Sequence, residues 1–577
     1  MISGAEIMVK CLEAEGVDIV FGYPGAAICP FYDKVYDSSI THILVRQEQN
    51  AAHAASGYAR CSNRPGVCVA TSGPGATNLI TGIATAYTDS IPIVAITGQV
   101  RSDLLGRDVF QEADITGACE PFVKHSYLVS KTEDLPRVFK EAFHIASTGR
   151  PGPVLIDIPV DIQENEIESF EYPESVNIIG YKPNTKGHAI QVKKAVEAIN
   201  ASKRPVIVSG GGVLSSGIKL KLQKFAETTG IPVISTMMGI GVMPSEHELY
   251  LGMLGTHGKA VANRALHEAD LVIVCGARLG DRAVAAPDQM SENTKVIHID
   301  IDPAEIGKNV KTEIPIVGDM KNVINMLLDS IGDYKVTTMW SETVKNWKKD
   351  LYREPPVFDG FVEPRTLVGH LSAMFRSKAI LVADVGQNQI WCANNFRIRE
   401  GRFLTTGGMG TMGYSIPAAI GAKFARPDRD VIVICGDGSF QMGLNELATI
   451  AGNQLGIKII IMKNARLGMV RELQDKHYGG RHSATILNGD PGFLKMLTAL
   501  TMQRLIQTRK PKTSSRVLLI RKNRSFLFAM FTPTLRQFNE VIKCSIHYQY
   551  LLKIRRAFFQ RFRDFSLAEV LTSTHSQ

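Results

Sequence analysis

VIVICGDGSFQMGLNELATIAGNQLGIKIIIMKNARLGM, Val431–Met469, is the stretch in which the fold signal of this chain is clearest. Five apolar residues are followed by the triplet Gly436-Asp437-Gly438, and a helical pattern then leads to a second apolar run, Ile457–Met462. This order predicts a strand, a turn, a helix and a second strand parallel to the first.

Asp437 and Asn464 make this unit a candidate metal site. The glycines of the triplet let the backbone approach a ligand closely, and the turn presents a diphosphate to a helix N-terminus. Asn464 follows the second strand, and its amide oxygen and the Asp437 carboxylate are the hard oxygens that suit Mg²⁺ bound to phosphate. A Gly-Asp-Gly triplet alone is usually a plain turn. Its place between strand and helix, with Asn464 after the next strand, favours a metal–diphosphate clamp.

Length and composition indicate a multidomain α/β enzyme. The chain has 577 residues, 45% of them hydrophobic, with 50 glycines, and three or four domains are expected at about 100–200 residues each. The nine cysteines are scattered without metal-type spacing, which favours reduced thiols. No apolar run reaches the roughly 18 residues of a membrane span. We therefore expect a cytoplasmic protein that binds no membrane.

The charge is distributed unevenly. The net charge is +9, but residues 494–577 hold 16 Lys and Arg against three Asp and Glu, so the first 493 residues are mildly acidic. All 50 glycines precede residue 494. A basic nucleic-acid-binding module in this tail is one interpretation, but no glycine–aromatic interleaving or module signature supports it, and we expect no nucleic-acid partner.

Apolar runs predict the other strands. They alternate with helical patterns such as Ala5–Glu15, which is typical of parallel α/β domains. The expected strands are Val17–Phe21, Ile43–Val45, Gly66–Thr71, Ile91–Thr97, Val154–Pro159, Pro205–Ser209, Leu271–Cys275, Lys295–Ile301 and Ala379–Asp384.

Glu48 is the candidate proton-transfer residue. It follows an apolar strand and precedes the small-residue run AAHAASGYA. A surface carboxylate at a helix start is the plainer interpretation, but this setting predicts a carboxylate in a tight, partly apolar place, where its pKa would rise.

Residues 1–493 resemble the catalytic large subunits of the acetolactate synthases, within the thiamine-diphosphate enzyme family that includes pyruvate oxidase and glyoxylate carboligase. The motifs that carry the resemblance are FGYPGAA, VRQEQNAAHAASGYAR, TSGPGATN, FQEADITG, RPGPVLIDIP, GGMGTMGYSIPAAIGA, GDGSF and NARLGMVRELQ.

The resemblance implies an α/β fold of three doubly wound parallel-sheet domains. They are a pyrimidine-binding domain at 1–165, a central FAD- or nucleotide-binding-like domain at 190–335, and a pyrophosphate-binding domain at 361–493 that is incomplete. Residues 336–360 form a polar connector. Residues 494–577 do not match, and we interpret them as a basic tail that is out of frame.

The resemblance also implies roles for particular residues. Glu48 hydrogen-bonds the aminopyrimidine of thiamine diphosphate, Met412 props the bent cofactor, and Asp437, Asn464 and the Arg466 carbonyl hold Mg²⁺. Gln111 and Met469, with Phe110 and Arg282, match substrate-pocket positions. Further cofactor positions are Tyr23, Gly25, Pro74, Asn78, Gly386, Gln387, Gly436, Gly438 and Ser439.

For FAD, which is structural rather than redox-active in acetolactate synthase, the expected contacts lie mostly at strand ends of the central domain. They are Arg150, Gly211, Gly212, Thr256, His257, Gly276, Arg278, Asp300 and Asp319.

The implied activity is the joining of two pyruvates, or of pyruvate and 2-oxobutyrate, with loss of CO₂ in branched-chain amino-acid biosynthesis. The implied partners are the 2-oxo acids, further copies in a homodimer or homotetramer, and a small regulatory subunit. Two alternatives stay open: another thiamine-diphosphate enzyme such as pyruvate oxidase, and an inactive frameshifted paralogue.

The chain departs from the family pattern at several positions. They are Ala26, Gln47, Val160, Asn388, Lys463 and Leu473. Most are expected at the substrate entrance, so they bear on the choice of oxo acid more than on cofactor chemistry. The interpretation of 494–577 as out of frame predicts that the final strand and helix of the third sheet are missing and that a strand edge is exposed. It also predicts that the segments FLFAMF (526–531) and RRAFFQRF (555–562) do not pack there.

Overall fold

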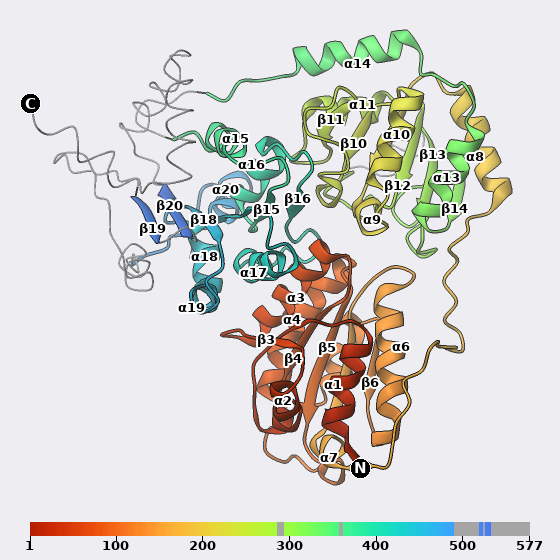
Figure 1. Cartoon of the computed structure of the whole chain (residues 1–577). Helices are drawn as coiled ribbons and strands as arrows, with labels where there is room; N and C mark the ends of the chain where they lie inside the picture. The colour runs from red at the N-terminus through yellow and green to blue at the C-terminus, as the bar shows by residue number, and fades with distance from the viewer. Residues whose placement is uncertain (285–293, 357–361, 490–517, 523–525, 532–577) are drawn as a thin grey trace, which may run out of the picture.

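The computed structural model describes residues 1–284, 294–356, 362–489, 518–522 and 526–531. It contains three six-stranded sheets, and a small two-stranded pair of β1 (Ile2–Ser3) and β8 (Glu166–Ile167). The N-terminal unit lies below, and the central and C-terminal units lie side by side above it (Figure 1). The predicted class, three parallel-sheet α/β units, is confirmed.

The N-terminal sheet has the strand order β3-β2-β4-β5-β7-β6 and is parallel throughout. Its strands are β2 (Ile19–Gly22), β3 (Thr41–Leu44), β4 (Gly66–Ala70), β5 (Ile93–Gln99), β6 (His125–Leu128) and β7 (Val154–Pro159). Five of the six agree with the apolar runs within a few residues. The sixth, β6, was not predicted, because its sequence HSYL has no apolar run and none of its residues is fully buried.

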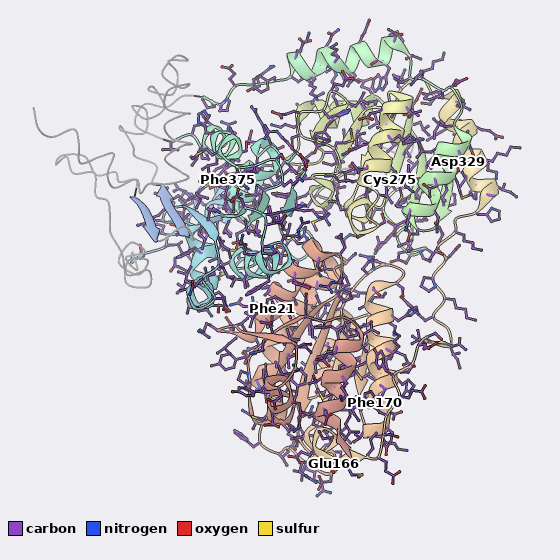
Figure 2. The ribbon with its side chains drawn as sticks, viewed as in Figure 1. Phe21, Glu166, Phe170, Cys275, Asp329 and Phe375 are labelled. Carbon is purple, nitrogen blue, oxygen red and sulfur yellow. The ribbon has the colours of Figure 1, made fainter. Side chains whose placement is uncertain are left out.

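Helices cover both faces of this sheet (Figure 1). They are α1 (Gly4–Ala14), α2 (Cys29–Tyr36), α3 (Glu48–Ser62), α4 (Pro74–Thr88), α5 (Ile115–Cys119), α6 (Leu135–Ser147) and α7 (Val160–Glu164). Phe21 is fully buried in the sheet (Figure 2), and its ring meets Tyr58 of α3 and Phe424 of the C-terminal unit edge-on. The core is therefore continuous between the two units.

The central sheet has the order β11-β10-β9-β12-β13-β14, also parallel. Its strands are β9 (Pro205–Ser209), β10 (Val233–Ser235), β11 (Tyr250–Met253), β12 (Leu271–Cys275), β13 (Lys295–Asp300) and β14 (Ile314–Val317). Around it lie α8 (Ala189–Ala201), α9 (Gly211–Ser215), α10 (Lys219–Thr229), α11 (Ala260–Glu268) and α13 (Met320–Ser330). Cys275 ends the buried strand β12 (Figure 2).

The expected polar connector is partly wrong. Residues 338–350 form a helix, α14 (Thr338–Asp350), that packs on the central unit. Trp340 is 2% exposed, donates from its indole nitrogen to the Pro205 carbonyl (3.1 Å), and meets Trp347 edge-on. Buried tryptophans supply much apolar area and need a partner for the N–H, so these residues make the segment part of the central unit.

The C-terminal sheet has the order β16-β15-β17-β18-β20-β19. Its strands are β15 (Ile380–Ala383), β16 (Arg402–Leu404), β17 (Val431–Gly436), β18 (Ile457–Met462), β19 (Leu518–Lys522) and β20 (Phe526–Phe531). Its helices are α15 (Pro364–Met374), α16 (Gln387–Asn395), α17 (Ser415–Ala425), α18 (Asp437–Gly443), α19 (Leu447–Gly452) and α20 (Gly468–His477). The β17–turn–α18–β18 unit is the one that the sequence predicts.

The prediction of an exposed strand edge, against which FLFAMF does not pack, is wrong at β18. β20 pairs with β18 in parallel, from Lys458 opposite Leu527 to Met462 opposite Phe531, and β19 pairs antiparallel outside it. The segment FLFAMF has the unbroken apolar sequence that a strand in a parallel sheet needs. The rest of the tail, including RRAFFQRF, lies outside the described residues.

Two glycines set the contact between the N-terminal and C-terminal units. A Cβ on Gly57 of α3 would lie 2.0 Å from the Ala418 carbonyl oxygen, and one on Gly421 of α17 would lie 1.8 Å from the Ala54 carbonyl oxygen. Helices α3 and α17 therefore touch backbone to backbone, which only residues without a side chain allow.

Candidate active site

The turn between β17 and α18 presents Asp437. Asp437 is only 2% exposed, and its Oδ2 accepts a hydrogen bond from Ala465 N (2.7 Å). Burial raises the pKa of its carboxyl. Asn464 closes the facing turn after β18 by accepting from Arg466 N (3.0 Å). Gly436 and Met462 are paired across β17 and β18, so the two turns meet at the same edge of the sheet.

A cavity of about 320 Å³ opens at these turns. Ten of the predicted site residues line it: Gly386, Gln387, Met412, Gly436, Asp437, Gly438, Ser439, Asn464, Arg466 and Met469. The sequence-based prediction of a metal–diphosphate clamp thus corresponds to residues that converge on one space.

Several apolar residues of the cavity wall were not predicted. They are Val362, Pro364, Leu367, Trp391, Met462, Leu467 and Val470. Leu367 and Trp391 sit on amphipathic helices, where a side chain facing a cavity has the same sequence pattern as one facing a core. For Leu467 a signal was available, because it lies between the predicted Arg466 and Met469.

Gly386 and Gln387 form the second wall of the clamp, at the end of β15. Gly386 has a φ of 137°, a region that side chains rarely adopt, and Gln387 begins α16. The Gln387 amide nitrogen donates to the Glu472 carboxylate. Gly468 lies against the same amide, since a Cβ on Gly468 would clash with it.

Asn388, one of the departures from the family pattern, has a structural role here. Its side-chain nitrogen donates to the carbonyls of Asp384 (2.7 Å) and Ile434 (3.2 Å). It therefore ties the end of β15 to the end of β17, next to the clamp.

Asp384 holds the loop that carries Met412, and this role was not predicted. It is 1% exposed, and its two carboxylate oxygens accept from Gly413 N (3.0 Å) and Ser415 N (2.9 Å). Burial raises the pKa of its carboxyl. An aspartate at a strand end was the available signal.

Glu48 belongs to a second cluster, in the N-terminal unit. It is the first residue of α3, and its Oε2 accepts from the Asn78 side-chain amide (3.0 Å). Asn78 lies on α4, which begins at Pro74. A Cβ on Gly75 would lie 3.5 Å from Glu48 Oε1, and Gly25 packs on Thr71 just before this turn.

Gln111 lies at the border of this cluster. A Cβ on Gly73, next to Pro74, would meet the Gln111 backbone and Cβ at 2.9–3.0 Å. Gln111 has a φ of 60°, and Phe110 beside it is 87% exposed. Tyr23 of the same cluster is 40% exposed.

Within one chain, the two clusters are separate. The described residues that line the cavity run from Val362 to Leu473, whereas Glu48 and its neighbours lie between residues 23 and 111. The cavity of a single chain therefore includes the predicted metal ligands but not Glu48, the predicted proton-transfer residue.

The residues expected to bind FAD gather mostly at the carboxyl edge of the central sheet. Gly211 and Gly212 follow β9, Gly276 and Arg278 follow β12, Asp300 ends β13, and Asp319 follows β14 and caps α13 through Lys321 N. Thr256 and His257 follow β11. Such an edge is where parallel α/β sheets bind ligands.

Glycines and charged side chains lie close together at this edge. Gly276 has a φ of 56°, and a Cβ on Gly212 would lie 2.8 Å from Gly276 Cα, so two backbones run close together without side chains. Arg150 reaches over from the N-terminal unit and bonds Asp302 (3.1 Å) and Glu305 (2.6 Å). Burial raises the pKa of Asp300 to about 6.

Family models match all three units. The thiamine pyrophosphate enzyme N-terminal TPP-binding domain matches residues 2–118, the central domain 192–327, and the C-terminal TPP-binding domain 384–519. The last match extends to residue 519, although no glycine follows Gly492.

Curated relatives are similar over most of the chain. A probable acetolactate synthase large subunit of Methanocaldococcus jannaschii is 49% identical over 506 residues, which cover 86% of each chain. The acetolactate synthase large subunit of Haemophilus influenzae is 44% identical, covering 86% of this chain and 88% of its own. An acetolactate synthase of Mycobacterium bovis is 46% identical, covering 86% and 82%. Among the described residues, no helix is long and apolar enough to cross a membrane.

Proposed function

Because this chain belongs to the acetolactate synthase large subunits of the thiamine pyrophosphate (thiamine diphosphate) enzyme family, we propose that it joins two pyruvates, or pyruvate and 2-oxobutyrate, with loss of CO₂ in branched-chain amino-acid biosynthesis. The relatives favour this function over that of pyruvate oxidase. The observation that carries the proposal is the cavity that brings Asp437, Asn464 and Met412 together.

The cofactor supplies the electron sink that protein side chains lack. In the overall reaction, the bond between the carboxylate and the carbonyl carbon of the first oxo acid breaks and CO₂ leaves. A carbon–carbon bond then forms to the carbonyl carbon of the second oxo acid, whose oxygen takes up a proton.

We assign Mg²⁺ to the Asp437 carboxylate, the Asn464 amide oxygen and the Arg466 carbonyl. These are oxygen donors of the kind that Mg²⁺ prefers when it also binds phosphate. Ala465 N occupies one Asp437 oxygen, which orients the carboxylate and leaves the second oxygen for the ion. Gly438 and Ser439, at the start of α18, and Gly386 and Gln387 would face the diphosphate.

Glu48 is the proposed proton-transfer residue at the pyrimidine. The Asn78 amide holds one of its oxygens (3.0 Å) and leaves the other free toward Gly75. Since Glu48 does not line the cavity of the same chain, we propose that a second copy of the chain supplies it. The active form is therefore a homodimer or a homotetramer built from such dimers.

The wall around Met469, Leu473 and Trp391 would enclose the substrate. A largely apolar wall keeps water and stray protons from the reacting carbon until the second oxo acid arrives. Leu473 is one of the positions at which the chain departs from the family pattern, so we expect it to influence which oxo acid is accepted. Gln111, from the Glu48 cluster, would complete this wall in the dimer.

FAD is the proposed ligand of the central sheet edge, where Gly212 and Gly276 approach closely. Two relatives are named large subunits, which supports a small regulatory subunit as a further partner. The cytoplasm is the proposed location.

For residues 494–577 we make a separate proposal: they are translated out of frame. The loss of glycine and the excess of basic residues support it, while the pairing of β20 with β18 supports a tail that still closes the sheet. Sequencing the encoding DNA decides between them: an insertion or deletion near codon 494 is expected, and an intact frame relative to close relatives would refute it.

The deciding experiment is an assay of the purified full chain with thiamine diphosphate, Mg²⁺ and FAD. Acetolactate formed from pyruvate is the expected product. Acetyl phosphate or acetate instead would indicate the pyruvate oxidase alternative, and no product would indicate an inactive paralogue.

A further inference from the structure

Glu446 connects the clamp to the turn that carries Glu48. It is fully buried, at 0% exposed, and a buried carboxylate needs hydrogen-bond donors. Its Oε1 accepts from Arg46 N (2.8 Å) and from the Asn50 side-chain amide (2.9 Å). Since Arg46 and Asn50 flank Glu48, a side chain of the C-terminal unit holds the turn from which α3 begins.

The start of α3 depends on this external acceptor. Its N-cap, Gln47, makes no side-chain cap bond. Thr449 adds to the contact, because its hydroxyl donates to Glu446 Oε2 (2.6 Å) and lies 3.2 Å from the carbonyl oxygen of Leu44, the last residue of β3. The connection between β3 and α3 is therefore held from both sides by the same short segment.

The segment that holds Glu446 and Thr449 is connected along the chain to the clamp. The helix α18 begins at Asp437 and runs directly into the turn Leu444–Glu446. The path is packed tightly: Phe440 is 1% exposed, and a Cβ on Gly413 of the Met412 loop would lie 2.9 Å from Met442 Cβ. A close-packed interior transmits a shift at one end to the other.

We propose that Glu446 is a positioning residue, through which occupation of the clamp by Mg²⁺ and a diphosphate fixes the place of Glu48 of the same chain, the residue that this chain supplies to its partner in the proposed dimer. The inference rests on the proposed function, since it takes Asp437 as a metal ligand and Glu48 as the proton-transfer group. It adds a residue that touches neither cofactor nor substrate.

Amide hydrogen exchange on the full chain tests the link. The probe is Mg²⁺ with inorganic pyrophosphate, which suits the clamp but has no pyrimidine ring to touch Glu48. In the unmodified chain, the probe should slow exchange in the peptide that contains Arg46 and Asn50. In Glu446→Gln, which keeps the size but loses a carboxylate oxygen, that peptide should exchange on the order of tenfold faster, as for a lost charged hydrogen bond, and should not respond to the probe.

Asp270→Asn is the matched control. Asp270 of the central unit also accepts from two backbone amides, Lys203 N (2.9 Å) and Arg204 N (3.0 Å), and from a hydroxyl, that of Ser202. This variant should keep the response of the unmodified chain. If Glu446→Gln does not fold, Thr449→Val removes only the hydroxyl donor and should weaken the response without abolishing it.

A full response in Glu446→Gln, or in Thr449→Val where that variant replaces it, would overturn the inference. So would binding of the probe, seen by calorimetry, with no change in the peptide of the unmodified chain. Failure of the probe to bind the unmodified chain is a different result: it refutes the clamp itself, and with it the proposed function.

Discussion

Asp437 is the residue on which the metal-binding proposal depends most, because it is the one carboxylate among the three proposed ligands. We expect Asp437→Ala to abolish metal-dependent binding of thiamine diphosphate, since Mg²⁺ then loses its only charged protein ligand. Titration calorimetry with and without Mg²⁺ measures this. Asp428→Ala, an exposed carboxylate before β17, is the control and should bind normally. Unchanged affinity in Asp437→Ala would refute the clamp.

Substitution of Glu48 should lower turnover without lowering cofactor affinity. Glu48→Gln keeps the hydrogen bond to Asn78 but cannot carry a proton, so we expect cofactor affinity near that of the unmodified chain and kcat lower by about 10²-fold or more. Steady-state kinetics at saturating cofactor check it. Glu120→Gln, an exposed carboxylate of the same unit, should have normal kcat, and a normal kcat in Glu48→Gln would remove Glu48 from the proposed role.

Asp157 should make stability depend on pH. It is 1% exposed, accepts from Thr97 (2.6 Å) and Gln99 (2.9 Å), and burial raises its pKa to about 7. The pKa of Asp157 is higher in the folded chain than in the unfolded chain. Its contribution to the free energy of unfolding is therefore complete below about pH 4 and is lost as the pH rises to about 7. The difference corresponds to about 4 kcal/mol at most.

Asp157→Asn should remove this dependence. Its Tm relative to that of the unmodified chain should rise between pH 5 and pH 7 and then level off, as measured by thermal unfolding in a buffer series. A Tm difference that does not change with pH would contradict the titration.

At the scale of elements, the α3–α17 contact leaves no room for side chains. Gly421→Ala should destabilise the chain by about 1–3 kcal/mol or more, because its Cβ would overlap the Ala54 carbonyl. Gly369→Ala is the matched control, since a Cβ on Gly369 within α15 meets nothing within 4 Å and alanine there should stabilise by roughly 0.5–1 kcal/mol. Denaturant unfolding compares the two. Equal stabilities would mean that the helices can separate without cost.

The sequence was most informative where strands are buried on both faces. The strands β7, β9, β12 and β18 begin and end as predicted, because a strand of a parallel sheet that is buried on both faces is an unbroken apolar run in the sequence. The edge strands β6, β11, β14 and β16 were missed, since edge strands are short. The interior strand β10 was missed as well, because it is only three residues long. The residues predicted for the clamp could be selected from the sequence because they lie next to such apolar runs. Glu446 was not predictable, because the turn that it holds lies about 400 residues away in sequence.

At the scale of the whole molecule, the separation of Glu48 from the cavity predicts complementation. Neither Glu48→Gln nor Asp437→Ala should be active alone, but unfolding and refolding them together should restore about one quarter of the normal activity. Half of the dimers are then mixed, and each mixed dimer has one intact site out of two. Activity of the mixture is assayed against each variant refolded alone.

The control for this experiment is a chain that carries both Glu48→Gln and Asp437→Ala. Refolded in the same way, it should stay inactive. An unmodified chain that is active as a monomer by sedimentation would contradict the shared site.

The glycine contact between α3 and α17 also constrains the construction of chimaeras. A hybrid that takes residues 1–165 from one relative and the remainder from another would join two helices that were selected with different partners. Alanine at either glycine position in one parent would push the helices apart, and the Glu48 turn would move with α3. Recombination within this family should therefore succeed where the two helices are inherited as a pair, even though they belong to different units of the chain.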